Sequence, residues 1–289
     1  MSSINTRKSD IVWNYIGTIV SMASGFVLLP LLMHFLSSSE LGLWYVYVAL
    51  SNFAMLFEFG FNPTFARNIV YVISGARHLS IEGCDIKSVQ EGIDWHLLNT
   101  VIKASKVIYA ILAVVVLALL STIGSLYISF VASGMGSFDI WVSWGLFCAS
   151  VFLNLYFLWS ITVLRGYGDI AGENKAVVIG RAAQLSVSAI LLLLGYGLVG
   201  AAIGYLANAI LLRLSAVVML RKHKEIEKGR HSDTMPVEAS SIREIFLTIF
   251  HVAWRDGLVQ LAVYASTQAM SILTVSYTHL RAHETRHDL

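Results

Sequence analysis

The chain has 289 residues, of which 56% are hydrophobic and only 13% are charged. A water-soluble domain of this length with so many apolar side chains would expose large apolar patches, so the composition excludes that class. The formal net charge is +2. A charge this small gives no indication of a nucleic-acid partner.

Seven long apolar runs dominate the sequence. They lie at about 11–33, 41–61, 107–130, 140–164, 176–194, 199–220 and 247–275. A hydrocarbon core of about 30 Å requires about 20 helical residues, so each run is long enough to cross a membrane. The first run is too long for the core of a signal peptide and is interpreted as a retained span. The predicted fold class is an all-α polytopic membrane protein.

Basic residues follow a one-sided pattern between these runs. The N-terminus and the connections 62–106, 165–181 and 221–243 carry all but four of the 20 lysines and arginines. The connections 34–40, 131–139 and 195–198 carry none. Because cytoplasmic loops are enriched in Lys and Arg, the N-terminus is predicted to be cytoplasmic.

Composition changes divide the chain into four parts. Residues 1–230 are predicted to form a six-span N-terminal bundle, and 231–246 a hydrophilic linker with the start of a second half. Residues 247–275 are predicted to be the first helix of a second bundle that the chain otherwise lacks. Basic residues and an aromatic precede this span, as they precede the first, which is typical of a parallel repeat.

Residues 276–289 form a polar tail that does not match the sequence before it. The tail would place Arg281 and Arg286 on the outer face, against the pattern of the other loops. It resembles the translation of a sequencing adapter, so we expect it to be non-native and the chain truncated. The alternative is a metal site, because His279, His283 and His287 share one helix face. Spacing alone is a weak signal, and no metal is expected.

A helix interruption is predicted near residue 61. Asn62 supplies a capping side chain and Pro63 suits the first helical position, so one span ends near Phe61 and a short helix follows. Glu58 and Arg67 flank this break. They are interpreted either as an ion pair that closes a loop at headgroup level or as a polar patch at the mouth of a transport cavity.

Four segments carry a family resemblance. They are LLPLLMHFLSSSELGLWYVYVALSNF (28–53), EFGFNPTFARNIVYVISGA (58–76), FLNLYFLWSITVLRGYGDI (152–170) and LLLLGYGLVGAAIGYLANAI (191–210). In their order and spacing they resemble the O-antigen-type oligosaccharide flippases, in the polysaccharide-export family of the multidrug/oligosaccharidyl-lipid/polysaccharide (MOP) flippase superfamily. The resemblance extends over about 1–275. It implies two helical bundles around a central cavity, of which this chain carries one bundle and one further helix.

The resemblance also implies a function. Such proteins move a polyprenyl-diphosphate-linked oligosaccharide from the inner to the outer leaflet of the bacterial inner membrane, for cell-surface polysaccharide assembly. The implied partners are lipid-linked oligosaccharide, membrane lipid and a coupling ion, H⁺ or Na⁺. No enzymatic activity and no cofactor are expected.

Polar residues inside or beside the spans are the candidate substrate-binding groups. Guanidinium groups match phosphate oxygens, which favours the arginines as diphosphate ligands, and the asparagines are candidates for sugar contact. The candidates are Arg67, Arg213, Arg255, Glu58, Asp256, Asn14, Asn52 and Asn154. Arg213 lies about two turns inside the membrane, where it either snorkels to the interface or serves a cavity. Arg255 and Asp256 point about 100° apart on a helix and need not pair.

Two other functions are weighed against flipping. A small-molecule or drug antiporter of the same superfamily would need acidic residues to dominate its cavity, whereas embedded bases here at least match Glu58 and Asp256. An intramembrane glycan polymerase or ligase would need a large charged outer loop, and all three outer connections are short. No catalytic residue is assigned, and no disulfide is expected between Cys84 and Cys148.

Overall fold

The structure is a computed structural model that describes residues 8–80, 83–84, 91–132 and 138–287, with the backbone alone for 83–84, 264 and 267–287. Six helical stretches within these residues are long and apolar enough to cross a membrane. They are Lys8–Phe35, Ser38–Glu58, Trp95–Val131, Phe138–Gly166, Ile170–Leu193 and Gly197–Leu220. The chain is thus an all-α, multi-pass membrane protein, which confirms the predicted fold class.

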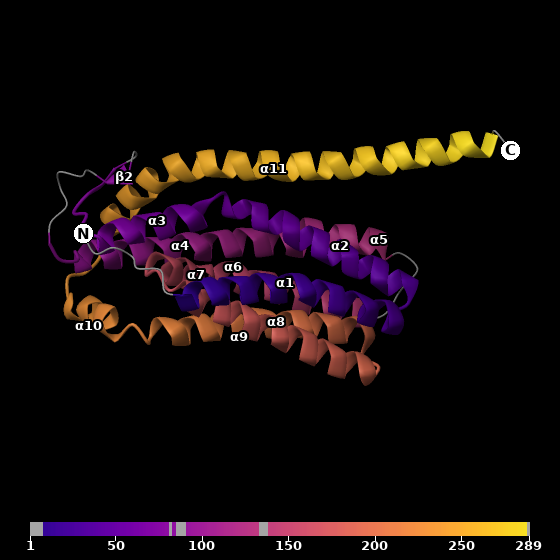
Figure 1. Cartoon of the computed structure of the whole chain (residues 1–289), viewed down its shortest axis with the longest axis horizontal. Helices are drawn as coiled ribbons and strands as arrows, with labels where there is room; N and C mark the ends of the chain where they lie inside the picture. Colours follow the sequence, from indigo (N-terminus) through magenta and orange to yellow (C-terminus); the bar gives the residue numbers. More distant parts are fainter. Residues whose placement is uncertain (1–7, 81–82, 85–90, 133–137, 288–289) are drawn as a thin grey trace.

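The spans run up and down along one axis (Figure 1). Two spans continue into further elements. The helix α2 (Ser38–Met55) leads through the 3₁₀ turn η1 (Leu56–Glu58) to α3 (Phe61–Ile73). The helix α4 (Trp95–Leu119) leads through the π-helical segment η3 (Leu120–Gly124) to α5 (Ser125–Val131). The others are α1 (Lys8–Phe35), α6 (Phe138–Tyr156), α7 (Leu158–Gly166), α8 (Ile170–Leu193) and α9 (Gly197–Leu220), followed by α10 (Lys224–Ser232) and α11 (Ala239–His287). A two-residue hairpin pairs β1 (Leu79–Ser80) with β2 (Gly83–Cys84).

The predicted connections 62–106 and 165–181 end too late, because residues 95–106 already belong to α4 and residues 170–181 to α8. The short helix expected after the break near residue 61 is confirmed as α3. Two lysines on these helices hold their ammonium groups over aromatic rings, which stabilises the cations. The Lys106 ammonium lies 4.2 Å from the centroid of the Trp159 ring, and that of Lys175 lies 5.0 Å from the Trp13 ring. The connections were predicted too long because every basic residue between two apolar runs was assigned to a loop.

The basic connection 221–243, which includes the start of the linker, is more ordered than its composition predicted. Residues 224–232 form α10, which packs against the start of α4, where Gly229 contacts the Trp95 ring. The Asn99 side chain bonds both the Arg230 carbonyl, at 3.0 Å, and the Asp233 carboxylate, at 3.1 Å. These contacts hold the linker against the bundle. The next helix then starts at Ala239 rather than near 247.

Two apolar cores lie in series along the bundle. The core farther from the N-terminus includes Trp44, Tyr47 and Phe147, and the core nearer to it includes Phe65 and Tyr109. The first core ends at Ala54 on the second span and Leu155 on the fourth. The second core begins at Phe61 and Leu158 on the same two spans. Both spans are interrupted between these positions, so the helix breaks coincide with the boundary between the cores.

Small residues allow α8 and α9 to lie close together. A β-carbon on Gly204 would collide with Ser188, and one on Gly180 would meet the Leu212 Cβ at 2.7 Å. Close approach through small residues is the usual way in which membrane helices associate, since burial from lipid provides little driving force.

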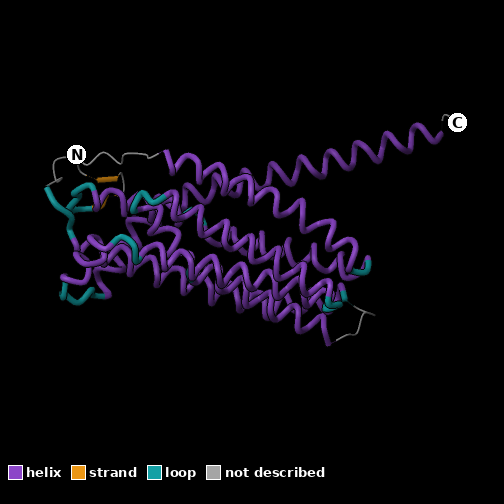
Figure 2. Tube along the Cα trace, turned by 60° about the horizontal axis from the view of Figure 1, so that its bottom comes forward, coloured by secondary structure: helices purple, strands orange, loops and turns teal. Residues whose placement is uncertain are grey.

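The helix α11 belongs only partly to the bundle. Ile245, Ile249 and Ala253 are buried in the core nearer the N-terminus, and Phe61 of α3 stacks on Phe246 with ring centroids 6.3 Å apart. Its later turns extend past the far end of the bundle (Figures 1 and 2). The prediction of a separate span over 247–275 thus corresponds to a helix whose first turns are docked on α3 and α4.

Candidate functional site

The break in the second span is built by left-handed backbone at two successive residues. Phe59 has φ 46° and Gly60 has φ 74°. The Asn62 backbone N–H, in the first turn of α3, donates to the Glu58 carboxylate. Gly60, not Asn62, is the residue at the N-cap position, so the predicted capping role of Asn62 is wrong. Glu58 is buried at 8% exposure, and its carboxylate lies at the N-terminal end of α3.

A hydrogen-bonded chain links this break to the fourth span. The Thr162 hydroxyl of α7 donates to the Asn62 side-chain oxygen at 2.9 Å. The Tyr109 hydroxyl of α4 lies 3.4 Å from the Thr162 hydroxyl and completes the chain. Both Tyr109 and Thr162 are fully buried. Such buried polar chains fix the relative setting of the helices that carry them.

The break in the fourth span lies at Phe157, between α6 and α7. Asn154 is in the last turn before it, and its side-chain oxygen accepts a hydrogen bond of 3.3 Å from Nη2 of Arg213 on α9. Arg213 is only 7% exposed, so it is buried in the bundle and does not snorkel. Its Nε and Nη1 atoms are buried and have no hydrogen-bond partner among the described residues. The structure therefore brings two of the candidate residues together at the second break.

Arg67 and Asp256, two further candidates, form an ion pair between α3 and α11. Nη2 of Arg67 lies 3.1 Å from the Asp256 carboxylate, which also accepts a hydrogen bond of 3.2 Å from Thr64. The side chains are 46% and 35% exposed. Arg67 thus pairs with the helix that follows the linker, and the alternative of a loop-closing pair with Glu58 is not the arrangement seen.

Three candidates take part in none of these side-chain contacts. Asn14, Asn52 and Arg255 are exposed on the surfaces of α1, α2 and α11. The sequence analysis did not select Arg181 and Gln184, which both lie on α8. Arg181, assigned to a loop from its sequence, is on α8 and donates to the Gln184 side chain at 3.0 Å. A polar residue every few positions in an otherwise apolar span was the available signal for both.

The polar cluster is suited to binding rather than to bond making. We define it as Glu58, Asn62, Tyr109, Asn154, Thr162 and Arg213. It offers hydrogen bonds and one buried cation at the level of two interrupted helices. Interrupted helices near the middle of the membrane are where transporters place substrates and ions. Among the described residues no group of three or more His, Cys, Asp and Glu side chains is placed to hold a metal.

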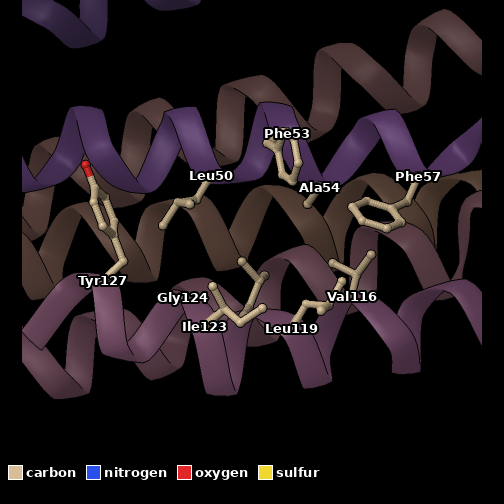
Figure 3. A pocket seen from close by; sticks show the side chains of 10 residues that line it. Leu50, Phe53, Ala54, Phe57, Val116, Leu119, Ile123, Gly124 and Tyr127 are labelled. Atoms are coloured by element: carbon tan, nitrogen blue, oxygen red, sulfur yellow. The ribbon is translucent and has the colours of Figure 1, made fainter. Parts of the chain in front are cut away.

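An apolar groove lies beside the second span, on the other side of its break from α3. It has a volume of about 430 Å³ and lies between α2 and the segment formed by α4, η3 and α5 (Figure 3). Leu50, Phe53 and Phe57 form one wall, and Ile123 and Tyr127 contribute to the other. The groove fits an aliphatic chain or another apolar group.

The fold is similar to about half of two solved membrane transporters. A MOP-superfamily transporter from Pyrococcus furiosus, described as having a binding pocket of reversed polarity, superimposes with a TM-score of 0.62 and 20% sequence identity. It is matched over 90% of this chain and 54% of its own length. An outward-facing multidrug-resistance transporter of the MATE family superimposes with a TM-score of 0.61, 20% identity and coverage of 89% and 54%. The chain thus spans about half the length of both. No family model and no curated protein matches the sequence.

Proposed function

We propose that the protein translocates a polyprenyl-diphosphate-linked oligosaccharide from the inner to the outer leaflet of a bacterial inner membrane, with its N-terminus in the cytoplasm. The observation that carries this proposal is Arg213, a buried guanidinium beside an interrupted helix, two of whose nitrogen atoms have no partner among the residues that the structure describes. A buried cation without a counter-charge costs several kcal/mol, and an anionic substrate removes that cost when it binds. The similar solved structures are transporters, which agrees with a role in translocation and not in catalysis.

The remaining groups of the site suit the other parts of such a substrate. Asn154 beside Arg213 can donate to a sugar hydroxyl or phosphate oxygen through its amide nitrogen. Ile210 and Leu214, on the same helix as Arg213, are exposed and offer apolar surface for a polyprenyl chain. Four other candidates are exposed on the bundle: Arg67, Arg255, Asn14 and Asn52. In this proposal they contact the substrate at a surface that no described element covers.

The membrane potential supplies a driving force for this direction. Each negative charge that moves outward across an inside-negative membrane gains about 2.3 kcal/mol per 100 mV. A diphosphate carries about two such charges, so translocation needs no nucleotide if cations such as Arg213 lower the barrier midway. A coupling ion, H⁺ or Na⁺, is compatible with the same scheme.

A drug antiporter is the second candidate function, and Glu58 favours it. A carboxylate buried at a helix break is the kind of group that exchanges a proton or Na⁺ in ion-coupled export. One of the two similar structures is a multidrug-resistance transporter. In this alternative, Glu58→Gln abolishes ion-coupled export while Arg213→Ala has little effect.

The deciding experiment measures both activities in the same cells. We expect Arg213→Ala to reduce delivery of lipid-linked oligosaccharide to the outer leaflet at least tenfold at matched protein levels. Arg213→Lys should restore only part of it, because the charge returns without the planar fork. Arg221→Ala, at the exposed end of the same helix, is the control. Unchanged delivery in Arg213→Ala, together with drug export lost in Glu58→Gln, would establish the antiporter instead.

A further inference from the structure

The short helix α10, between the last of the six spans and α11, is docked on the bundle through one of its faces. Gly229 lies against the ring of Trp95 on α4. The Arg230 Nε donates to the Asn99 side chain of α4 at 3.0 Å, and the same guanidinium pairs with Glu227 at 2.6 Å. These contacts fix the rotation of α10 about its own axis.

The face of α10 that points away from the bundle carries two lysines. Lys224 and Lys228 are four residues apart, so they project on the same side of the helix. At about 100° per residue, Gly229 and Arg230 lie about 100° or more round the helix from both lysines. Both lysines are exposed, as the docked position of the other face requires.

The protein does not neutralise this charge. Lys222, in the turn before α10, is exposed as well, and we call Lys222, Lys224 and Lys228 the basic face. None of the three forms an ion pair with a carboxylate of the described residues. Glu225 is exposed beside them and offsets one of the charges. The basic face is therefore net positive and open to an anion from outside the chain.

The position of the basic face selects the kind of anion. The last of the six spans ends at Leu220, two residues before Lys222. Side chains this close to the end of a span lie near the lipid headgroups, and the long stem of a lysine lets its ammonium group reach them. Lysines next to a span are attracted by anionic lipids, whose field extends about one Debye length, or about 10 Å at 0.1 M salt.

We propose that the basic face of α10 binds the phosphate groups of anionic membrane lipids while the other face stays docked on α4. The contact is electrostatic and requires no particular lipid chain. It supports the connection between the first six spans and α11 on the membrane surface. The proposal is independent of what the bundle transports and of which leaflet is cytoplasmic.

The test measures which lipids lie beside α10 in the full chain. In a background lacking Cys84 and Cys148, a fluorophore is attached at His231→Cys, on the same side of α10 as Lys228. The protein is placed in phosphatidylcholine nanodiscs at low salt. Phosphatidylglycerol or phosphatidylcholine with a spin label near its headgroup is titrated in, and quenching of the fluorophore is followed. We expect phosphatidylglycerol to reach half-quenching at a mole fraction at least fivefold lower.

Charge variants assign this preference to the basic face. Lys224→Gln/Lys228→Gln should bring the two lipids within about twofold of each other, whereas Lys224→Arg/Lys228→Arg keeps the charges and should keep the preference. Glu225→Gln should increase it, because a repulsive charge is removed. Lys8→Gln, at the exposed start of α1, is the matched control and should leave the preference unchanged. All these positions are exposed, so every variant should unfold at the wild-type temperature in pure phosphatidylcholine.

Two results would overturn the proposal. One is equal quenching by both lipids in the wild type, which is also the result expected if the basic face serves an acidic protein instead. The other is an unchanged preference in Lys224→Gln/Lys228→Gln. An electrostatic contact further requires that the wild-type preference falls when salt is raised to about 0.5 M, because the Debye length shortens.

Discussion

Arg67 on α3 and Asp256 on α11 form a 3.1 Å ion pair that joins the helix break of the second span to the first helix after the linker. The carboxylate also accepts a hydrogen bond from Thr64 on α3. The contact therefore sets how the start of the second half sits against the first. Both side chains are partly exposed, so the pair itself contributes about 1 kcal/mol or less.

The first prediction concerns this pair. Asp256→Asn should increase hydrogen exchange in the first turns of α11 severalfold and leave the exchange of α8 unchanged. The double variant Arg67→Asp/Asp256→Arg restores opposite charges and should recover most of the protection. Glu238→Gln, just before α11, is a control at an exposed site. Equal exchange in all four proteins would show that apolar packing alone holds α11.

The second prediction tests the backbone of the break. Gly60 has φ 74°, and an added β-carbon would lie 2.7 Å from the Asp256 Cβ and 3.1 Å from the Gly257 nitrogen. Gly60→Ala should therefore destabilise the protein by about 2 kcal/mol, from left-handed strain plus the collision. Gly25→Ala is the matched control, since nothing lies within 4 Å of its β-carbon. If the two variants unfold at the same temperature, the backbone of the break accommodates the added β-carbon and this prediction is wrong.

The positions of the six spans could be predicted because the length of an apolar run is the strongest sequence signal for a membrane-spanning helix. The existence of a break near residue 61 was also readable, from Asn62 and Pro63. How the break is built could not be predicted, because nothing in the sequence indicates that Phe59 adopts left-handed backbone. The sequence pointed to the wrong cap for this reason.

The partners within the site were beyond sequence reasoning. Arg213 and Asn154 were separate candidates, and their contact depends on how α6 and α9 are rotated about their axes. The pairing of Arg67 with Asp256, 189 residues apart, depends on where the linker delivers α11. Arg181 was placed in a loop because charge was taken to mark loop ends, whereas its hydrogen bond to Gln184 lies on α8.

The third prediction follows from the short connection between α7 and α8. Asp169 accepts from the Gly172 N–H at 2.7 Å and lies 2.9 Å from His223 Nε2. The hydrogen bond from His223 is the main cause that lowers the pKa of Asp169 below its usual value. A lowered pKa in the folded state gives stability that is present above about pH 4 and is lost as pH falls through the folded pKa.

Asp169→Asn keeps a capping oxygen for Gly172 but removes the charge. The wild type should unfold at higher temperature than this variant near pH 7, and the difference should narrow between about pH 5 and pH 3. Asp139→Asn, in the exposed first turn of α6, is the control, and its difference should not narrow comparably. If the difference in unfolding temperature between the wild type and Asp169→Asn stays constant over this pH range, the charge of Asp169 does not contribute to stability.

The last prediction concerns orientation. In the structure Ser38 lies at one end of the bundle, at the start of α2, and Lys228 lies on α10 at the other. The basic connections are at the second end, and cytoplasmic loops are enriched in Lys and Arg. In a background lacking Cys84 and Cys148, a membrane-impermeant thiol reagent should label Ser38→Cys in intact cells and reach Lys228→Cys only after permeabilisation. Both positions are exposed, so accessibility to solvent does not limit either reaction. Labelling of Lys228→Cys alone in intact cells would place the N-terminus outside. It would then reverse the direction in which the potential drives an anion past Arg213.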